Sequence, residues 1–345
     1  MKPVRVFIVD DSSIVRRVLS EELAVDPAIT VVGSAPDPYA ARDAIVTLRP
    51  DVVTLDIEMP RMDGINFLGR IMKHLPMPVI VLSSLTPRHS ELSMEALRLG
   101  AVDVVCKPGL AYSIGDLAPV LREKVKAAAQ ARPQALQDLP KRLSVKHVLA
   151  SSRATHQIIA IGASTGGTVA IETVLRQLPP TCPGILITQH MPAQFTTAFA
   201  KRLDDTCPMR VREAQNGDPV APGLALIAPG DNHLLFERSG ATGIARVKSG
   251  PLVNRHRPSV DVLFRSVARH AGRNAVGVLL TGMGRDGASG LAEMRAAGGH
   301  TIAQDEASCV VFGMPREAIE LGAVETILPL DRIAGHLAQQ AQRSP

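Results

Sequence analysis

Short runs of β-branched and aliphatic residues alternate with segments of helical periodicity along most of this chain. In the first third of the sequence the strand-like runs are Val4–Val9, Thr30–Val32, Val52–Leu55, Val79–Leu82 and Val102–Val105. Apolar runs of this kind, separated by helices, are typical of strands buried on both faces of a parallel sheet. We therefore predict an N-terminal α/β domain with a doubly wound, five-stranded sheet.

The same alternation returns in the second half of the sequence. Here the strand-like runs are Ile158–Ile161, Ile185–Thr188, Ala225–Ile227, Val276–Leu280 and Gly299–Ala303. No repeat with a period of roughly 20–50 residues is visible, which argues against a solenoid or another repeat array. The pattern predicts a second α/β domain, again built on a parallel sheet.

The segment between these two regions has a different composition. Glu123–Arg153 contains Pro133 and Pro140, no strand-like run, and 7 Lys or Arg against 2 Asp or Glu. Such a segment is typical of a solvated linker, here following a helix that we expect to end near Gln130. We predict a domain at residues 1–122, a linker at 123–153 and a second domain at 154–345.

Composition narrows the class of protein. Hydrophobic residues make up 46% and charged residues 21% of the chain, which is enough apolar material for packed cores. Aromatic residues make up only 3%, with no Trp and two Tyr, which argues against modules that stack nucleic-acid bases on aromatic side chains. We expect no nucleic-acid partner. No apolar run approaches the ~20 residues of a membrane span, so we expect no membrane insertion either.

Cysteine usage and the start of the chain bear on its compartment. The sequence runs from Met1 directly into the first strand-like run, which leaves no room for a signal peptide. Four cysteines lie far apart and form no CxxC pair, so neither zinc nor a disulfide framework is indicated: Cys106, Cys182, Cys207 and Cys309. These features predict a reduced, cytoplasmic protein.

Polar residues follow the strands of the first domain. Asp10-Asp11, Asp56, Ser83-Ser84 and Lys107 each stand at or just after the end of a strand-like run. The carboxyl ends of parallel strands meet at one edge of a sheet, so these side chains should converge there. Clustered carboxylates repel one another unless a cation is present, and an all-oxygen ligand set suits Mg²⁺. A lysine and a hydroxyl opposite them could bind a transferring phosphoryl group.

These motifs resemble the receiver domain of two-component response regulators across about residues 3–122. The matching stretches are Val9-Asp10-Asp11-Ser12, Leu55-Asp56-Ile57-Glu58-Met59-Pro60 with Asp63-Gly64, and Cys106-Lys107-Pro108. The resemblance implies a flavodoxin-like fold in which Asp56 accepts a phosphoryl group from a histidine kinase. It implies a set of Mg²⁺ ligands as well: Asp10, Asp11, Asp56 and the backbone carbonyl of Glu58.

Three further expectations come from the same resemblance. Ser83 and Lys107 would sense the phosphate. The peptide bond before Pro108 is expected to be cis, as in a tight turn at a functional loop. Val104 stands where receivers often carry an aromatic switch residue, so the usual aromatic rotamer switch is not expected here.

A glycine-rich turn opens the second domain. Ile158–Ile161 is followed by Gly162-Ala163-Ser164-Thr165-Gly166-Gly167 and then by a helical stretch. A serine on a tight strand-to-helix turn exposes its hydroxyl, and the free N–H groups of the first helical turn can stabilise an oxyanion. A phosphate-binding loop would need Gly-Lys where the chain has Gly167-Thr168, and the dinucleotide-binding GxGxxG spacing is absent.

Two later strand ends supply partners for this serine. His190 follows the strand-like run Ile185–Thr188, and Asp286 lies in the glycine-rich turn after Val276–Leu280. We predict that His190 takes the proton from Ser164 and that Asp286 orients the imidazole. The chain order Ser, His, Asp disfavours the α/β-hydrolase fold, in which the acid precedes the histidine. Most other histidines are expected at the surface or at caps, with His233 and His256 as the alternatives.

From end to end, the chain resembles the chemotaxis protein-glutamate methylesterase family. The matching stretches are Ile161–Gly167, Gln189–Pro192, His256–Phe264, Leu280–Gly287, Thr301–Glu306 and Val311–Pro315. In that family the serine, histidine and aspartate of the catalytic triad correspond to Ser164, His190 and Asp286. The resemblance also places Thr165 and the turn around Met283 beside the oxyanion.

The resemblance implies a phosphorylation-activated enzyme with two related activities. It would hydrolyse glutamyl γ-methyl esters on the cytoplasmic helices of methyl-accepting chemoreceptors and deamidate particular receptor glutamines. A chemotaxis histidine kinase would be the phosphodonor, and the esterase step would need no cofactor. Two alternatives stay open: the same esterase acting on another target protein, or a non-catalytic response regulator whose second domain binds a partner.

Overall fold

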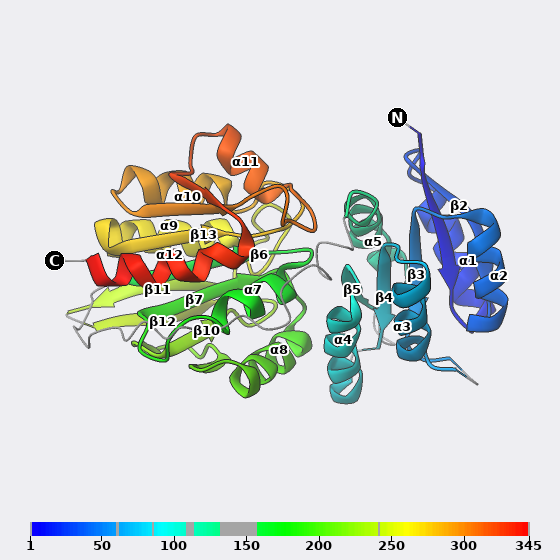
Figure 1. Ribbon diagram of the computed structural model, residues 1–345, viewed down its shortest axis with the longest axis horizontal. Helices are drawn as coiled ribbons and strands as arrows, with labels where there is room; N and C mark the ends of the chain where they lie inside the picture. The colour runs from blue at the N-terminus through cyan, green and yellow to red at the C-terminus, as the bar shows by residue number, and fades with distance from the viewer. Residues whose placement is uncertain are drawn as a thin grey trace. The chain divides into compact units, whose positions relative to one another are not determined.

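The computed structural model describes residues 2–59, 62–84, 86–107, 114–131, 157–240 and 242–343. The chain divides into two compact units, Met1–Asp138 and Leu139–Pro345. Each unit is an α/β structure with its own sheet (Figure 1). In the described parts of the chain, no helix is long and apolar enough to cross a membrane.

The N-terminal unit alternates strands and helices from one end to the other. Its strands are β1 (Val4–Val9), β2 (Ile29–Ala35), β3 (Val52–Asp56), β4 (Val79–Ser83) and β5 (Asp103–Cys106). Its helices are α1 (Ser13–Ala24), α2 (Pro38–Leu48), α3 (Gly64–His74), α4 (Pro87–Leu99) and α5 (Ile114–Ala128).

Polar residues fix where three of these helices begin. The Ser12 hydroxyl accepts a hydrogen bond from the N–H of Val15 at the start of α1. Asp37 caps α2 in the same way and Asp63 caps α3, because their carboxylates accept from N–H groups of the first helical turn. Side-chain acceptors at these positions satisfy donors that have no partner within the helix.

The five strands of this unit form a parallel sheet in the order β2-β1-β3-β4-β5. Strands β3 and β4 are buried along their whole length, as expected for a sheet covered by helices on both faces. The chain crosses from β1 to β2 on one side and then returns to β3 on the other. The sheet therefore has its switch point between β1 and β3, where ligands of such sheets bind at the carboxyl ends.

The C-terminal unit contains more strands than its strand-like runs predicted. Its strands are β6 (Ile158–Ala163), β7 (Gly184–Gln189), β8 (Arg210–Glu213), β9 (Pro219–Val220), β10 (Leu224–Ile227), β11 (His233–Ser239), β12 (Thr242–Lys248), β13 (Ala275–Leu279), β14 (His300–Gln304) and β15 (Thr326–Leu328). Its helices are α7 (Gly167–Leu175), α8 (Ala193–Thr206), α9 (Val260–Ala271), α10 (Ala288–Ala296), α11 (Met314–Glu320) and α12 (Leu330–Arg343), with a 3₁₀ turn at Gly272–Asn274.

Seven of these strands form one sheet in the order β15-β14-β13-β6-β7-β10-β8, and their pairings are parallel. The chain runs outward from β6 through β7 and later returns to β13 on the other side of β6. The switch point of this sheet therefore lies between β6 and β13. Strands β11, β12 and β9 form a separate antiparallel sheet.

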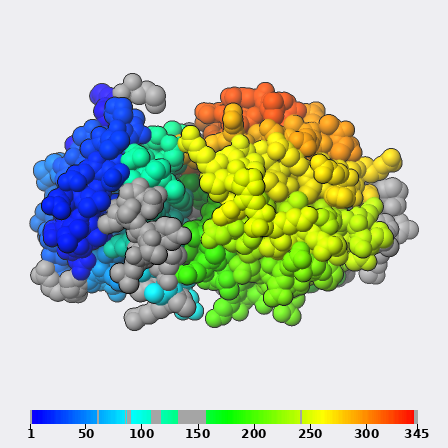
Figure 2. Space-filling view, turned by 180° about the vertical axis from the view of Figure 1, so that it is seen from behind, coloured from blue at the N-terminus to red at the C-terminus, as the bar shows by residue number. Residues whose placement is uncertain are grey.

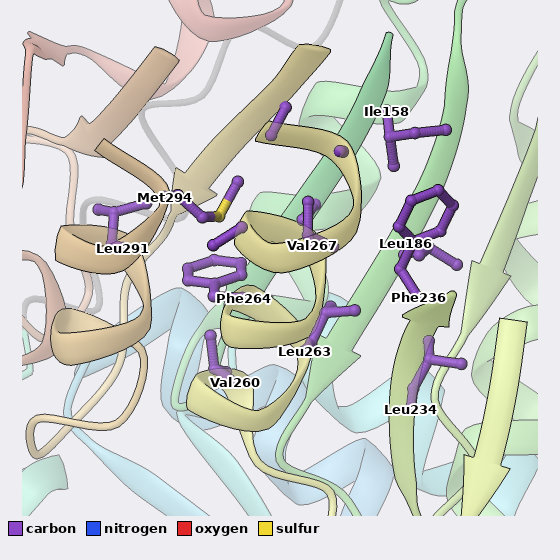
Figure 3. Close-up of a cluster of buried hydrophobic side chains, with 14 of the residues drawn as sticks. Ile158, Leu186, Leu234, Phe236, Val260, Leu263, Phe264, Val267, Leu291 and Met294 are labelled. Carbon is purple, nitrogen blue, oxygen red and sulfur yellow. The ribbon is translucent and has the colours of Figure 1, made fainter. Parts of the chain in front are cut away.

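Helix α9 forms the centre of the core on one face of the seven-stranded sheet. Its buried residues Val260, Leu263, Phe264 and Val267 follow the spacing of one helical face. Figure 3 shows these side chains between strands β6 and β7, strand β11 and helix α10. This packing fixes the position of the N-terminus of α9 at the carboxyl edge of the sheet.

The predicted fold class is confirmed for both domains. The sequence analysis did not find the β11–β12 hairpin, the edge strands β8 and β15, or the short β9. The exact domain ends, 122 and 153, stay a prediction, because the linker lies largely outside the described residues. Helix α5 ends at Ala128 and a turn follows to Gln130, close to the expected end of the helix.

Candidate functional site

Strand register brings Ser164 and His190 together. Strands β6 and β7 pair in parallel, with Ala163 opposite Gln189. The residue after each strand is therefore also a neighbour, and the His190 N–H donates to the Ala163 carbonyl at 3.2 Å. Strand β13 pairs with β6 on the other side. Ser164 thus stands at the switch point of the sheet, where the turn after β13 faces it.

A close approach of Gly282 to Ser164 joins these two turns. The Ser164 N–H donates to the carbonyl of Thr281 at 3.0 Å. A Cβ atom on Gly282 would lie 2.8 Å from the Ser164 Cβ and 2.4 Å from the Met314 sulfur. Only a glycine fits between these atoms, which explains the glycine at this point of the turn.

His190 and Asp286 form a buried pair. The Nε2 atom of His190 lies 2.8 Å from the Oδ2 atom of Asp286, and both side chains are almost fully buried. The Nδ1 atom of His190 is buried without a hydrogen-bond partner in the structure. Between the described residues Ser164 and His190, no side-chain hydrogen bond is formed.

The Asp286 carboxylate lies at the N-terminus of helix α9. It accepts hydrogen bonds from the N–H groups of Val260 (2.7 Å) and Asp261 (3.2 Å) and from the Ser259 hydroxyl (2.8 Å). Burial by itself would raise the pKa of Asp286, but the hydrogen bonds and the His190 ring hold this pKa well below its usual range. Asp286 is therefore an ionised helix cap as well as the partner of His190.

Asp261 repeats this arrangement at the next helix. Its Oδ1 atom accepts from the N–H groups of Gly287 (3.1 Å) and Gly290 (2.7 Å), in the first turn of α10. Burial raises the pKa of Asp261, and the nearby Asp286 adds to the increase. The two carboxylates tie the N-terminal ends of α9 and α10 to each other, a contact that the sequence analysis missed.

Two peptide groups beside Ser164 are held in fixed orientations. The Ser164 carbonyl accepts from the Gly167 N–H (2.7 Å) and from the Gln189 side-chain amide (2.9 Å). The Gly282 carbonyl accepts from the N–H groups of Gly313 (3.1 Å) and Met314 (2.8 Å). Because a peptide group is planar, each fixed carbonyl aims the following N–H in the opposite direction. Those N–H groups belong to Thr165 and Met283, the two residues predicted beside the oxyanion.

Buried polar side chains that the sequence analysis did not single out brace these turns. The Thr281 hydroxyl lies 3.0 Å from the Thr165 carbonyl and accepts from the Val311 N–H at 2.9 Å. The Gln304 amide oxygen accepts from the Thr281 N–H at 2.8 Å. The matches to Gln189, Thr281 and Gln304 within the family-like stretches were the only signal in the sequence that could have found them.

The two alternative histidines have different surroundings. The His256 ring stacks on the His190 ring, with centroids 3.7 Å apart and an interplanar angle of 10°. His233 is buried away from the triad; its Nε2 atom lies 2.8 Å from the Pro251 carbonyl, and its Nδ1 atom accepts from the Ser259 N–H at 3.2 Å. His233 therefore holds the ends of the loop that carries His256.

In the N-terminal unit the predicted carboxylates converge. Carboxylate oxygens of Asp10, Asp11 and Asp56 lie within 4.8 Å of one another, with Asp11 exposed and the other two buried. The Lys107 ammonium contacts Asp10 at 2.9 Å and Asp56 at 2.5 Å. A cluster of oxygens with one open side, beside a lysine, has the chemistry that Mg²⁺ and a phosphoryl group require.

Burial changes the proton affinity of the central carboxylate. It raises the pKa of Asp56 to about 6, although the neighbouring Lys107 ammonium acts in the opposite direction. The pKa of Lys107 is itself raised, because Asp56 and Asp10 outweigh the effect of burial. Asp56 is thus a buried group whose charge depends on the cations around it.

The remaining residues predicted for this site occupy the same sheet edge. Ser83 is buried at the end of β4, and its hydroxyl lies 3.5 Å from the Ser84 carbonyl. The Glu58 N–H donates to Asp56 at 3.1 Å. Val104 is buried within β5. Pro108, with its expected cis bond, lies outside the described residues.

Arg16 contacts the turn that carries Asp10 and Asp11, and the sequence analysis did not single it out. Its guanidinium donates to the backbone carbonyls of Asp10 (2.8 Å) and Asp11 (3.0 Å) and so fixes the turn after β1.

All four cysteines lie among the described residues, and no disulfide bond joins any of them to another. Burial raises the pKa of Cys182 to about 12 and that of Cys207 to about 11. Thiols with such values are protonated at neutral pH and poorly nucleophilic.

Comparison with known protein families divides the chain in the same way as the structure. The family described as CheB methylesterase matches residues 159–337, and the response regulator receiver domain matches residues 6–114.

Individual relatives are similar over nearly the whole chain. Protein-glutamate methylesterase/protein-glutamine glutaminase 4 of Anaeromyxobacter dehalogenans is 60% identical, covering 98% of this chain and 95% of the relative. The corresponding Yersinia pseudotuberculosis protein is 54% identical, covering 99% of this chain and 97% of the relative. The crystal structure of the Thermotoga maritima CheB methylesterase catalytic domain is 38% identical with a TM-score of 0.52, covering 53% of this chain and 98% of that domain.

Proposed function

The chain belongs to the CheB methylesterase family, and we propose that it hydrolyses glutamyl γ-methyl esters of chemoreceptors and deamidates receptor glutamines. The observation that carries this proposal is the position of Ser164, His190 and Asp286 at one switch point. The substrate class, methylated glutamates and glutamines of proteins, is taken from the names of the relatives in Anaeromyxobacter dehalogenans and Yersinia pseudotuberculosis.

The hydrogen bond to Asp286 assigns different tasks to the two nitrogens of His190. Nε2 carries the proton that it shares with the ionised Asp286 carboxylate, so Nδ1 has the free electron pair. We infer that Nδ1 removes the Ser164 hydroxyl proton while the serine oxygen attacks the side-chain carbonyl carbon. Asp286 then stabilises the imidazolium. The buried, unpartnered Nδ1 atom supports this assignment.

Collapse of the tetrahedral intermediate breaks the bond to the leaving group. The proton held on Nδ1 passes to methoxide, which leaves as methanol, or to the amide nitrogen, which leaves as ammonia. Water then attacks the acyl-serine with Nδ1 as base, and the proton returns to the Ser164 oxygen. Both substrates end as the same glutamate carboxylate, which is why one site serves both activities.

Backbone N–H groups stabilise the oxyanion in this mechanism. The Ser164 N–H is bonded to Thr281 and is not free for this task. The N–H groups of Thr165 and Met283 are better candidates, because hydrogen bonds on the preceding carbonyls fix their directions. Preorganised donors lower the barrier because they need no rearrangement when charge develops on the oxygen.

The receiver domain receives the regulatory signal. We propose that Asp56 accepts a phosphoryl group from a chemotaxis histidine kinase and that Asp10, Asp11, Asp56 and the Glu58 carbonyl hold Mg²⁺. When bound, the cation would neutralise charge on the transferring phosphoryl group. Lys107 and Ser83 would then contact the phosphoryl oxygens. The converging carboxylates and the Lys107 contacts support this site. We also propose that the enzyme is cytoplasmic, where such a kinase would phosphorylate it.

Serine labelling and ester hydrolysis together test the proposed chemistry. The full chain is treated with a fluorophosphonate probe and, separately, with a peptide that contains glutamyl γ-methyl ester, and methanol release is measured. We expect Ser164→Ala and His190→Ala to abolish both reactions and to leave the fold intact. Ser289→Ala, an exposed serine on α10, and His270→Ala at the end of α9 are the matched controls.

Each alternative function has its own outcome in this test. A wild-type chain that neither reacts with the probe nor hydrolyses the peptide would be a non-catalytic regulator. Hydrolysis of the peptide, with receptor methylation unchanged in cells that lack the protein, would indicate a different target.

A further inference from the structure

A tight hairpin at residues 253–256 carries two side chains that contact the triad, those of Asn254 and His256. Val253 and His256 exchange backbone hydrogen bonds at 3.0 and 2.9 Å, which closes a tight hairpin around Asn254 and Arg255. Both central residues have left-handed backbone conformations, with φ of 50° and 68°. This is the geometry of a type I′ turn, in which the second position favours glycine.

The left-handed conformation of Arg255 is unfavourable by itself, so contacts with the surrounding structure must stabilise it. A non-glycine residue is disfavoured in this conformation, because its Cβ atom comes too close to the following carbonyl oxygen. The loop is held at several points: Arg257 donates to the Gly250 carbonyl at 2.6 Å, and His233 binds Pro251 and Ser259. Strained residues that the surrounding structure fixes in this way occur preferentially at functional sites.

The Asn254 amide joins the two buried carboxylates. Its nitrogen donates to Asp286 Oδ1 and to Asp261 Oδ2, each at 2.8 Å. Two hydrogens on one nitrogen thus hold the triad acid at a fixed distance from the acid that caps α10. Asp286 cannot rotate away from His190 without breaking this bond.

The second side chain of the hairpin limits the motion of the base. The His256 ring lies parallel to the His190 ring at 3.7 Å. Asp286 fixes one edge of the His190 ring and His256 covers one face, so tilting of the ring out of the Asp286 plane is opposed. The hairpin lies at the surface, since Leu252 and Arg255 are exposed. The yellow segments around residues 250–270 form part of the outer surface in Figure 2.

We propose that Asn254 and His256 are positioning residues, which hold Asp286 and the His190 ring in the orientation that makes Nδ1 a base. The inference rests on the proposed serine chemistry. Neither residue contacts the reacting atoms in this proposal. They act through the triad, so their loss should slow acylation of Ser164 and leave substrate affinity unchanged.

Asn254→Gly tests the amide, because glycine keeps the left-handed turn and removes only the side chain. We expect the rate of Ser164 phosphonylation by a fluorophosphonate to fall about tenfold or more in the full chain, since small errors in position have large effects on rate. For the methyl-ester peptide, kcat should fall with KM unchanged. The matched control is Asn274→Gly. Asn274 lies just before β13, at the end of that strand away from the Asp286 turn, so this variant should keep the wild-type rate in both reactions.

Asn254→Asp separates the hydrogen bonds from the shape of the side chain. Aspartate tolerates the same turn but donates nothing to Asp286 and adds a third negative charge. We expect a loss at least as large as that of Asn254→Gly. In an Asp286→Asn background, Asn254→Gly should cause little further loss, because residues that act through one unit are not additive.

Two substitutions of His256 test the stacking. His256→Ala should slow labelling about tenfold, and His256→Phe should restore it to within about threefold of wild type, because phenylalanine keeps a flat ring over His190. Equal losses in both variants would overturn the role of stacking. Wild-type labelling rates in both Asn254 variants would overturn the role of the amide.

The proposed function and the positioning role fail in different ways. Labelling that survives Ser164→Ala would refute the serine chemistry and, with it, this inference. Labelling that needs Ser164 but is unaffected by substitution of Asn254 and His256 would refute the positioning role alone.

Discussion

Substitution of Asp286 by asparagine should disrupt catalysis and stability at the same time, for separate reasons. The carboxylate accepts five hydrogen bonds: one from His190, one from Asn254, and three from Ser259 and the first turn of α9. Asparagine has the same shape but only one acceptor oxygen. If this oxygen stays at Oδ1, the new NH₂ group faces His190 Nε2 and the Val260 N–H.

The effect on turnover follows from the tautomer of His190. An NH₂ group at the Oδ2 position donates to Nε2, so the ring proton moves to Nδ1 and Nδ1 can no longer act as a base. In a serine protease the corresponding aspartate-to-asparagine change lowers kcat about 10⁴-fold for this reason. We expect a loss of about this size for Asp286→Asn, which is smaller than the complete loss for Ser164→Ala.

The effect on stability follows from the hydrogen bonds at Oδ2. Asparagine leaves the Val260 N–H without an acceptor and replaces the charge-assisted bond to His190 by a weaker, neutral one, and hydrogen bonds to a charged group contribute about 1.5–3 kcal/mol each. We therefore expect the unfolding free energy of the C-terminal unit to fall by about 3 kcal/mol at pH 7.

The pKa of Asp286 gives this difference a pH dependence. It lies below its usual range in the folded state, so the contribution of the charge to stability is complete above the unfolded pKa of about 4. It is lost as the pH falls through the lower folded pKa. The gap in stability between wild type and Asp286→Asn should therefore narrow below about pH 4.

The assay combines methanol release from the methyl-ester peptide with urea unfolding followed by circular dichroism. Asp205→Asn, an exposed aspartate on α8, is the matched control and should change neither quantity. Retention of more than about a tenth of the wild-type kcat would contradict the tautomer argument, whose expected loss is far larger. An unchanged unfolding free energy at pH 7 would contradict the capping role of Asp286.

Four further predictions concern the receiver and its effect on the esterase. Asp11→Ala should prevent Mg²⁺-dependent phosphorylation of Asp56 by a small phosphodonor, and phosphorylation at the normal rate in EDTA would contradict the proposed metal site. In a ¹³C NMR titration the Asp56 carboxyl should titrate near its pKa of about 6 without Mg²⁺ and at a lower pH with it, because a bound cation favours the charged form; an unchanged midpoint would exclude contact with the metal. Residues 150–345 alone should have a higher basal esterase rate than the unphosphorylated full chain if the receiver inhibits the enzyme, and a lower rate would indicate a receiver that assembles the site. Asp56→Asn should leave the basal rate in place and abolish its stimulation by a phosphodonor.

The sequence by itself determined the type of fold and the residues that carry the chemistry. Apolar runs and helical periodicity are local patterns. Residues that follow the strands of a parallel sheet lie at its carboxyl edge, where such sheets carry their functional sites. The acids at Asp10 and Asp56, and Ser164 and His190, could therefore be assigned to sheet edges before any contact was known. Short strands escaped this reasoning: β9 and β15 have too few residues to show a period, and the β11–β12 hairpin is only partly buried.

Only the tertiary structure decided which strand ends are neighbours. The position of β13 beside β6, rather than at an edge, brings the Asp286 turn to Ser164, and strand order depends on packing across the whole unit. The pairing of Asp286 with Nε2 of His190 likewise depends on tertiary contacts, because the first turn of α9 holds the Asp286 carboxylate in place. Asn254 contacts Asp261 and Asp286, which are 7 and 32 positions away in the chain, and no local pattern encodes contacts of that kind. They exist because the buried face of α9 fixes where its N-terminus, and the carboxylates around it, must lie.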